Sequence, residues 1–162
     1  MIIIRVLALF IACAAANLAR AEDMAETSCD ATCQRTQINA YYAGIDAIMM
    51  AGSTIDDIDT FLRGLHNDVR YIHEEYGAEF DKDTWHRAFI RQREQGSYNN
   101  GPDGKTSVLR VIHGYKFAAV EFRSRYTEGA TLIETPPRLA IFRFTDGKIS
   151  QIKEHWYHLA EQ

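Results

Sequence analysis

The hydrophobic residues of this chain recur at helical spacing in its first two thirds and alternate in its last third. Between Asp30 and Met50 they follow one another at intervals of three and four residues, which predicts an amphipathic helix. Ser53 or Thr54 is expected to cap a second helix, whose apolar stripe runs to Leu65. The fold is therefore expected to begin with two packed helices.

A short extended segment and a third helix are expected next. Residues Asp68–His73 are predicted to form the extended segment. Asp81 or Asp83 is expected to start the helix, because acidic residues are favoured in a first turn. This helix places Trp85 and Phe89 on one face, since residues four apart are neighbours on a helix.

From residue 107 onward the apolar positions alternate, which is typical of strands with one buried face. The expected strands are Ser107–His113, Phe117–Tyr126 and Leu132–Thr145, followed by a last strand after the turn at Asp146-Gly147. Pro136 and Pro137 interrupt the third strand, because proline cannot donate a ladder hydrogen bond. The last strand sends Ile152, Glu154 and Trp156 to one face.

Helices followed by strands predict an α+β domain, with three N-terminal helices packed on a strongly curved antiparallel sheet. The helical hairpin Ile38–Leu65, the segment Asp68–His73, the hairpin Phe142–Ile149 and the following Glu154–Trp156 together resemble one family. This is the nuclear-transport-factor-2-like superfamily, in its SnoaL-like (polyketide-cyclase-like) branch, over residues 36–159. The resemblance implies a cone with a pocket between sheet and helices. It also implies either ligand binding alone or isomerase, cyclase, dehydratase or epoxide hydrolase activity.

Aromatic and ionisable residues from three elements are expected to line this pocket: Tyr71, His73, Trp85, Phe89, Glu154 and Trp156. Glu154 and His73 are the candidate catalytic pair, since a carboxylate and an imidazole can move a proton between carbons. Both also fit a core role, with His73 bonded to backbone and Glu154 paired with an arginine. The favoured function is binding of a small, mostly apolar molecule, and catalysis by an isomerase, cyclase or dehydratase stays open. No cofactor or metal is expected.

The opposite face of the sheet is expected to be charged. Glu121, Arg123 and Arg125 alternate along one strand, and neighbouring strands supply Arg110, Arg143 and Lys153. Such residues form cross-strand ion pairs on a solvated face. Two alternatives stay open, an anionic ligand facing Arg123 or Arg125 and a homodimer interface. The resemblance implies the homodimer.

Residues 1–21 have the pattern of a signal peptide cleaved after Ala21, with an apolar run too short to span a bilayer. A buried N-terminal helix and a lipoprotein signal ending at Cys13 stay as alternatives. Removal of 21 of the 162 residues leaves 141, which suits one domain. Loss of Arg5 and Arg20 takes the formal net charge from −4 to −6, which gives no support for nucleic-acid binding.

Cys29 and Cys33 remain in the N-terminal arm, residues 22–35. An even number of cysteines in an exported chain predicts a disulfide, which residues four apart on a helix can form. Intermolecular pairing and a catalytic role are the alternatives. The expected location is the periplasm or the exterior, with no stable membrane insertion after cleavage.

Overall fold

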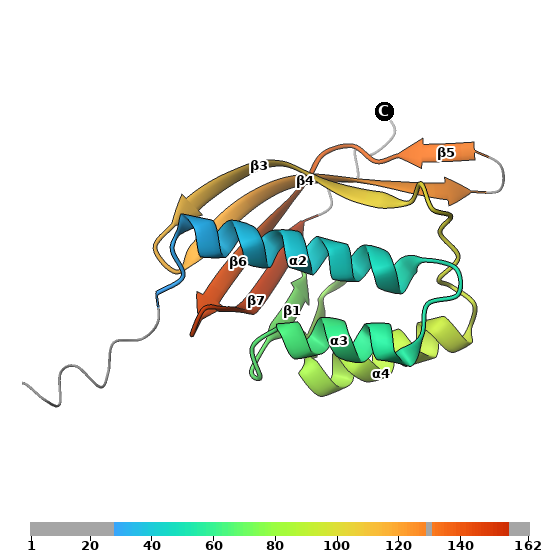
Figure 1. Cartoon of the computed structure of the whole chain (residues 1–162), viewed down its shortest axis with the longest axis horizontal. Coiled ribbons are helices and arrows are strands. Elements are labelled where there is room, and N and C mark those ends of the chain that lie inside the picture. The colour runs from blue at the N-terminus through green and yellow to red at the C-terminus, as the bar shows by residue number, and fades with distance from the viewer. Residues whose placement is uncertain (1–27, 129–130, 156–162) are drawn as a thin grey trace, which may run out of the picture.

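In the part of the chain that the structure describes, three α-helices and a seven-stranded sheet form an α+β domain, and the predicted fold class is confirmed (Figure 1). The computed structural model describes residues 28–128 and 131–155. The expected signal peptide and Trp156 lie outside these residues. The helices are α2 (Ala31–Met49), α3 (Ile55–Gly64) and α4 (Lys82–Glu94). None of the helices within the described ranges is long and apolar enough to cross a membrane.

Each helix begins at a polar side chain that accepts a backbone hydrogen bond. The Asp30 carboxylate accepts from the Cys33 N–H at 2.8 Å at the start of α2. Thr54 and Asp57 form a reciprocal capping box on α3, and Asp81 caps α4. The start signals read from the sequence therefore lie within one or two residues of the observed helix ends.

The sheet has the strand order β2-β1-β7-β6-β4-β3, with β5 paired to β4. Its strands are β1 (Arg70–His73), β2 (Ala78–Asp81), β3 (Lys105–Gly114), β4 (Phe117–Glu128), β5 (Thr131–Glu134), β6 (Arg138–Thr145) and β7 (Lys148–His155). A short 3-10 helix, η1 (Glu74–Tyr76), joins β1 to β2. All pairs are antiparallel except β1 with β7, so the sheet differs from the expected antiparallel sheet in this one pair. The long connection between these two strands makes parallel pairing possible.

The third predicted strand is divided by its two prolines. β5 pairs with the distal half of β4, while β6 pairs with the proximal half at Phe117–Phe122. Pro136 and Pro137 lie between them, where no ladder hydrogen bond is needed from their nitrogens. The alternation changes phase across the prolines. Glu134 of β5 pairs with Arg125 on the outer face, whereas Arg138 of β6 points to the same side as the buried Ala140.

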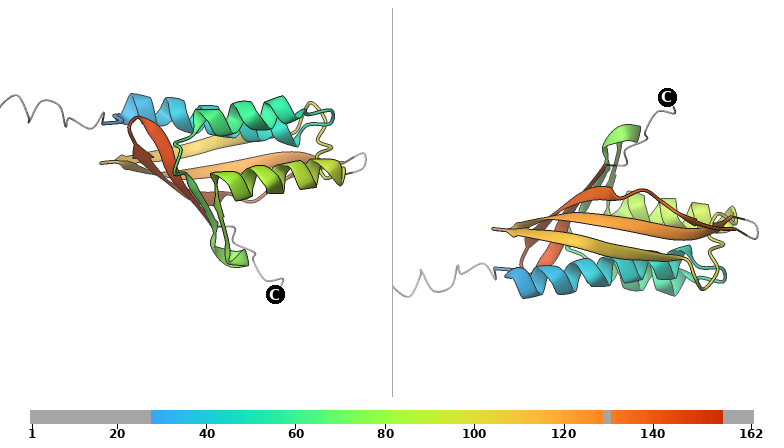
Figure 2. Two further views of the ribbon diagram at one scale, coloured as in Figure 1. Left: turned by 90° about the horizontal axis from the view of Figure 1, so that it is seen from below. Right: turned by 90° about the horizontal axis from the view of Figure 1, so that it is seen from above.

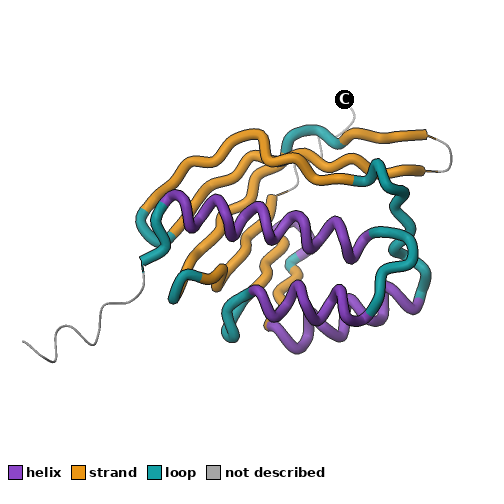
Figure 3. The backbone as a smooth tube through the Cα atoms, in the orientation of Figure 1, coloured by secondary structure: helices purple, strands orange, loops and turns teal. Residues whose placement is uncertain are grey.

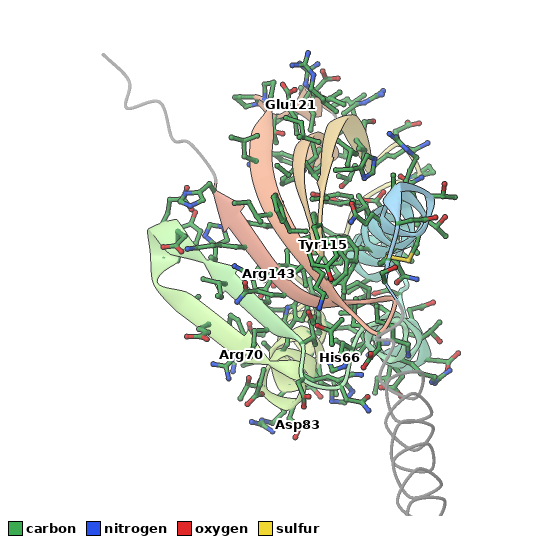
Figure 4. The ribbon with its side chains drawn as sticks, turned by 90° about the vertical axis from the view of Figure 1, so that its left-hand side faces the viewer. His66, Arg70, Asp83, Tyr115, Glu121 and Arg143 are labelled. Carbon is green, nitrogen blue, oxygen red and sulfur yellow. A yellow bond between two sulfur atoms is a disulfide. The ribbon has the colours of Figure 1, made fainter. Side chains whose placement is uncertain are left out.

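The core lies between the concave face of the sheet and the three helices (Figures 1 and 2). In β6 the buried residues Ala140, Phe142 and Phe144 alternate with exposed neighbours, among them Arg143, which Figure 4 labels. Tyr41 from α2 meets Phe142 edge to face, with ring centroids 5.1 Å apart. Aromatic contacts therefore connect the helical layer to the sheet.

Helices α2 and α3 pack against each other (Figure 3), and a glycine of α2 lies at their contact. A methyl group placed on Gly44 would lie 2.6 Å from Cδ2 of Phe61. Real Cβ atoms essentially never come so close, so a side chain at this position would force Phe61 to shift. Phe61 in turn meets Trp85 of α4 edge to face at 5.5 Å.

The predicted disulfide between Cys29 and Cys33 is confirmed, with an S–S distance of 2.01 Å (Figure 4). It spans the first turn of α2, where the two Cα atoms are 5.2 Å apart. The Cys33 sulfur lies 3.6 Å from the carbonyl oxygen of Gly147 in the β6–β7 turn. Beside it, the buried Gln34 amide donates to the carbonyls of Cys29 and Gly114. The start of α2 is therefore joined to two hairpin turns.

Candidate functional site

A cavity of about 360 Å³ lies between the inner face of the sheet and helices α2 and α4. Its walls are mainly aromatic, with a few polar side chains, which is typical of small-molecule sites. Four of the six residues predicted to line a pocket do so: Tyr71, Trp85, Phe89 and Glu154. They come from β1, α4 and β7, which are far apart in the sequence.

Glu154 is the buried carboxylate of this cavity, with 5% of its surface exposed. The Tyr71 hydroxyl donates to its Oε2 at 2.9 Å, and the Tyr41 hydroxyl donates to its Oε1 at 3.4 Å. Burial, followed by the charge of Glu154, raises the pKa of both phenols. Both hydroxyls therefore stay protonated and act as donors at neutral pH.

Arg138 is a cation on the cavity side of the sheet. Burial lowers its pKa, while the negative charge of Glu154 opposes that shift. The arginine that interacts electrostatically with Glu154 thus lies on the inner face, beside the site. The arginine expected near a core Glu154 corresponds to this residue, and Glu154 nevertheless lines the cavity.

Three stacked rings line one side of the cavity. Tyr71 and Trp85 stack with centroids 4.7 Å apart and planes 18° apart. Trp85 and Phe89 stack at 5.2 Å and 28°. Because stacked rings cover much of one another's faces, they give the cavity an apolar lining without a broad flat surface.

Tyr42 contributes a phenol from α2, and 4% of its surface is exposed. Its ring packs against Phe122 of β4, with centroids 5.0 Å apart. No described residue accepts from or donates to its hydroxyl, which is closed off from solvent. Burial raises the pKa of Tyr42, with smaller contributions from Glu154 and Tyr71. The hydroxyl is therefore a protonated donor.

His73 does not line the cavity, although it is buried and lies opposite Glu154 in the β1–β7 ladder. Its Nδ1 atom lies 3.3 Å from the Glu75 carboxylate, and its ring packs against Tyr76 at 4.4 Å. The two members of the predicted catalytic pair are thus neighbours in the sheet, but of the two only Glu154 lines the cavity.

Polar groups at the rim are engaged with the protein. Both carboxylate oxygens of Asp46 accept from the Thr106 N–H, at 3.0 and 2.9 Å. Arg125 reaches the rim, and its Nε lies 3.5 Å from the Glu134 carboxylate on β5. Across residues 28–128 and 131–155, no three His, Cys, Asp or Glu side chains converge as metal ligands.

No family model and no curated protein matches the sequence, whereas many solved structures match the fold. TerC, crystallised with polyporic acid, superposes with a TM-score of 0.56 at 17% identity, over 77% of this chain and 92% of TerC. Bal32a, from a soil-derived mobile gene cassette, gives 0.56 at 16% identity, over 80% and 92%. A nuclear-transport-factor-2-like protein of Burkholderia pseudomallei gives 0.55 at 16% identity, over 77% and 91%. The chain has the nuclear-transport-factor-2-like fold.

The nuclear-transport-factor-2-like fold accounts for a cavity between sheet and helices, as the resemblance implied. Sequence identities this low support a shared fold but not a shared function. The function therefore has to be inferred from the side chains of this chain. Sequence patterns missed three of those side chains: Tyr41, Tyr42 and Arg138. Helical spacing places both tyrosines on the apolar face of α2, and a buried phenol usually needs a partner for its hydroxyl. That requirement was the available signal.

Proposed function

We propose that this protein is exported and binds a small, mostly apolar molecule in the cavity beside Glu154. The observation that supports this is an aromatic cavity of about 360 Å³ containing one buried carboxylate. Apolar walls supply affinity by burying ligand surface, and a few polar groups fix orientation. Tyr41 and Tyr71 hold Glu154 in place, so the site is ordered before a ligand arrives.

The test is mass spectrometry of small molecules that co-purify with the protein, in wild type and in Glu154→Gln. We expect an apolar molecule with the wild type and a reduced amount with the variant, because the amide changes the polar contacts of the site. Glu134→Gln is the matched control, since Glu134 is a carboxylate on the outer face. Equal amounts of ligand in all three proteins would show that Glu154 does not contribute to binding. Absence of ligand from all three would contradict the binding function.

A second candidate function is cofactor-independent proton transfer by Glu154, as in an isomerase, cyclase or dehydratase. It is favoured by a buried carboxylate that lines an aromatic cavity, with Arg138 also in the lining to balance its charge. His73 does not face this space, so any second proton carrier has to be another group. Incubating the co-purified molecule with protein in deuterated water separates the two functions. Glu154-dependent exchange of a carbon-bound hydrogen indicates catalysis, and no exchange indicates binding alone.

Homodimerisation through the outer face of the sheet is part of the same proposal. Four exposed apolar side chains on β3, β4 and β6 support it: Ile112, Phe117, Leu139 and Ile141. Charged pairs such as Arg110–Glu121 flank them, as polar residues surround the apolar centre of an interface. Sedimentation of wild type and Ile112→Glu tests this, with a dimer expected for the first and a monomer for the second.

Export is tested by the mass of the purified protein. Cleavage after Ala21 gives a chain that begins at Glu22 and is recovered from the periplasm or the medium. A chain that keeps residues 1–21, or one that carries lipid on Cys13, would contradict this part of the proposal.

A further inference from the structure

We propose that Asn100 is a site of self-modification, at which the side-chain amide is converted to a carboxylate by deamidation in the folded protein. The proposal goes beyond the binding function and does not depend on any ligand. Asn100-Gly101 is the single Asn-Gly pair in the sequence. It lies in the connection between α4 and β3, beside the C-terminal end of α2 (Figure 1), and Asn100 contributes to the cavity lining.

The reaction needs only water and two groups that are neighbours in the chain. The backbone nitrogen of Gly101 forms a bond to Cγ of Asn100 and closes an imide ring. The bond from Cγ to the side-chain nitrogen breaks, and that nitrogen leaves as ammonia with the proton of the Gly101 N–H. Water then opens the ring at either of its carbonyl carbons, which leaves aspartate or isoaspartate at position 100. Holding nucleophile and carbonyl in one chain favours such a ring closure.

Gly101 distinguishes this asparagine from the others that follow residue 21. Glycine has no Cβ, so no side chain hinders the approach of its nitrogen to the preceding residue. No described residue accepts a hydrogen bond from the Gly101 N–H, so the nucleophile is not engaged. Residues with side chains follow the other three asparagines, Asn39, Asn67 and Asn99. Asn100 is therefore the residue at which the reaction is expected.

The side-chain amide of Asn100 is partly exposed, and no described residue is hydrogen-bonded to it. Its carbons occupy space that a glycine leaves open. A methyl group on Gly104 would lie 2.8 Å from Cβ and 3.1 Å from Cγ of Asn100. The main chain of Asn100, in contrast, is held on both sides. Its N–H donates to the Met49 carbonyl at 3.0 Å, and its carbonyl accepts from the Ala51 N–H at 2.9 Å.

The two products are expected to change the molecule in different ways. Both add a negative charge to a cavity lining that already contains Asp46 and Glu154, which makes this lining less favourable to anions. Isoaspartate also lengthens the main chain by one carbon, at a residue whose N–H and carbonyl are both bonded. The bonds to Met49 and Ala51 then cannot both keep their geometry, so we expect residues 97–104 to separate from the end of α2.

Peptide mapping by mass spectrometry tests the proposal on folded protein kept in mildly alkaline buffer. We expect loss of most of the Asn100 amide, while the amides of Asn39 and Asn67 persist. Both aspartate and isoaspartate should form, the latter detected as a substrate of protein isoaspartyl methyltransferase. Loss of the Asn100 amide that is no faster than the loss at Asn67 would overturn the proposal.

Gly101→Ala is the matched variant, and it is expected to retain the Asn100 amide. Its added methyl group would lie 3.6 Å from Oγ1 of Thr127, an ordinary contact, so the fold is expected to accept it. Equal loss in this variant would overturn the proposal. The same chain unfolded in urea supplies a further comparison. Conversion in urea but not in the folded protein would show that the bonds to Met49 and Ala51 prevent the reaction, and would also overturn it.

Hydrogen exchange at the Ala51 N–H tests the structural consequence, because this group donates to the Asn100 carbonyl. Protection is expected to be lost in the isoaspartate form of the aged protein. Asn100→Asp adds the charge without the extra carbon, so it is expected to keep this protection. Full protection in the isoaspartate form would contradict the separation of residues 97–104 from α2.

Discussion

Glu154 and Glu134 are carboxylates of the same sheet that lie in opposite environments. Glu154 faces inward from β7 and is held by two phenols, with 5% of its surface exposed. Glu134 lies on β5 and pairs on the outside with Arg123 and Arg125. On the inner face, each hydrogen bond replaces a bond to water that was lost on burial, so removal of one partner lowers stability strongly. Outside, water replaces any lost contact, and ion pairs contribute little.

The largest difference between the two faces is expected for adjacent residues of β6. Phe142 is fully buried against Tyr41, whereas 44% of Ile141 is exposed on the opposite face. Phe142→Ala is expected to lower the free energy of unfolding by about 3–5 kcal/mol, through lost burial and a cavity. Ile141→Ala is expected to change it by about 0.5 kcal/mol at protein concentrations where the chain is monomeric. Urea denaturation measures both, and equal losses would contradict the assignment of faces.

The next largest effect is expected at Glu154. Glu154→Ala leaves the hydroxyls of Tyr41 and Tyr71 without their acceptor, so we expect a loss of about 2–3 kcal/mol in unfolding free energy. Glu154→Gln keeps an acceptor oxygen and is expected to lose less. If the alanine variant were as stable as wild type, the phenols would have other partners and the ordered site would be wrong.

At alkaline pH, buried tyrosines are expected to lower the stability of the fold, whereas exposed tyrosines are not. Tyr41, Tyr42 and Tyr71 have a raised pKa through burial, and burial raises the pKa of Tyr98 to about 12. Below pH 10 their contribution to stability is complete. Above pH 10 the unfolded chain loses protons that the folded chain retains, so stability falls by up to about 1.4 kcal/mol per pH unit for each phenol.

Denaturation between pH 9 and about 12 measures this slope. Tyr71→Phe is expected to reduce it, because one buried phenol no longer titrates. Tyr115→Phe serves as the control, since that ring is exposed at the tip of the β3–β4 hairpin and is expected to leave the slope unchanged. Equal slopes in all three proteins would contradict the placement of Tyr71.

The smallest effect is expected for Glu134→Gln. Its pairs with Arg123 and Arg125 are solvent-exposed, so the unfolding free energy should change by about 0.5 kcal/mol or less. The change should shrink further in high salt, which screens exposed charges. A salt-independent loss above about 1 kcal/mol would mean that this face is buried, as in a dimer.

The alternation of apolar residues was enough to predict the two faces of the sheet and the side on which Glu154 lies. It could not predict that β1 pairs in parallel with β7, because strand partners far apart in sequence leave no local signal. This pairing brings His73 beside Glu154 in the ladder, yet η1 directs contacts of the imidazole toward Glu75 and Tyr76. A short irregular segment after a strand decides that contact, and strand periodicity says nothing about it.

The sequence also could not show which buried tyrosines line the cavity and which only pack in the core. Tyr41 and Tyr42 occupy the same helical stripe, and periodicity assigns both to the interior. Their hydroxyls differ, since one reaches Glu154 and the other reaches no described residue. That difference depends on a few ångströms of side-chain placement across two elements.

Gly44 suggests how the size of the cavity can be altered from outside it. A methyl group at this position would displace Phe61, and Phe61 meets both Trp85 and Phe89 edge to face. Those two rings are the cavity wall, so α3 supports the wall from behind. Natural variation at this one position could therefore change which ligands fit without replacing any residue that touches them.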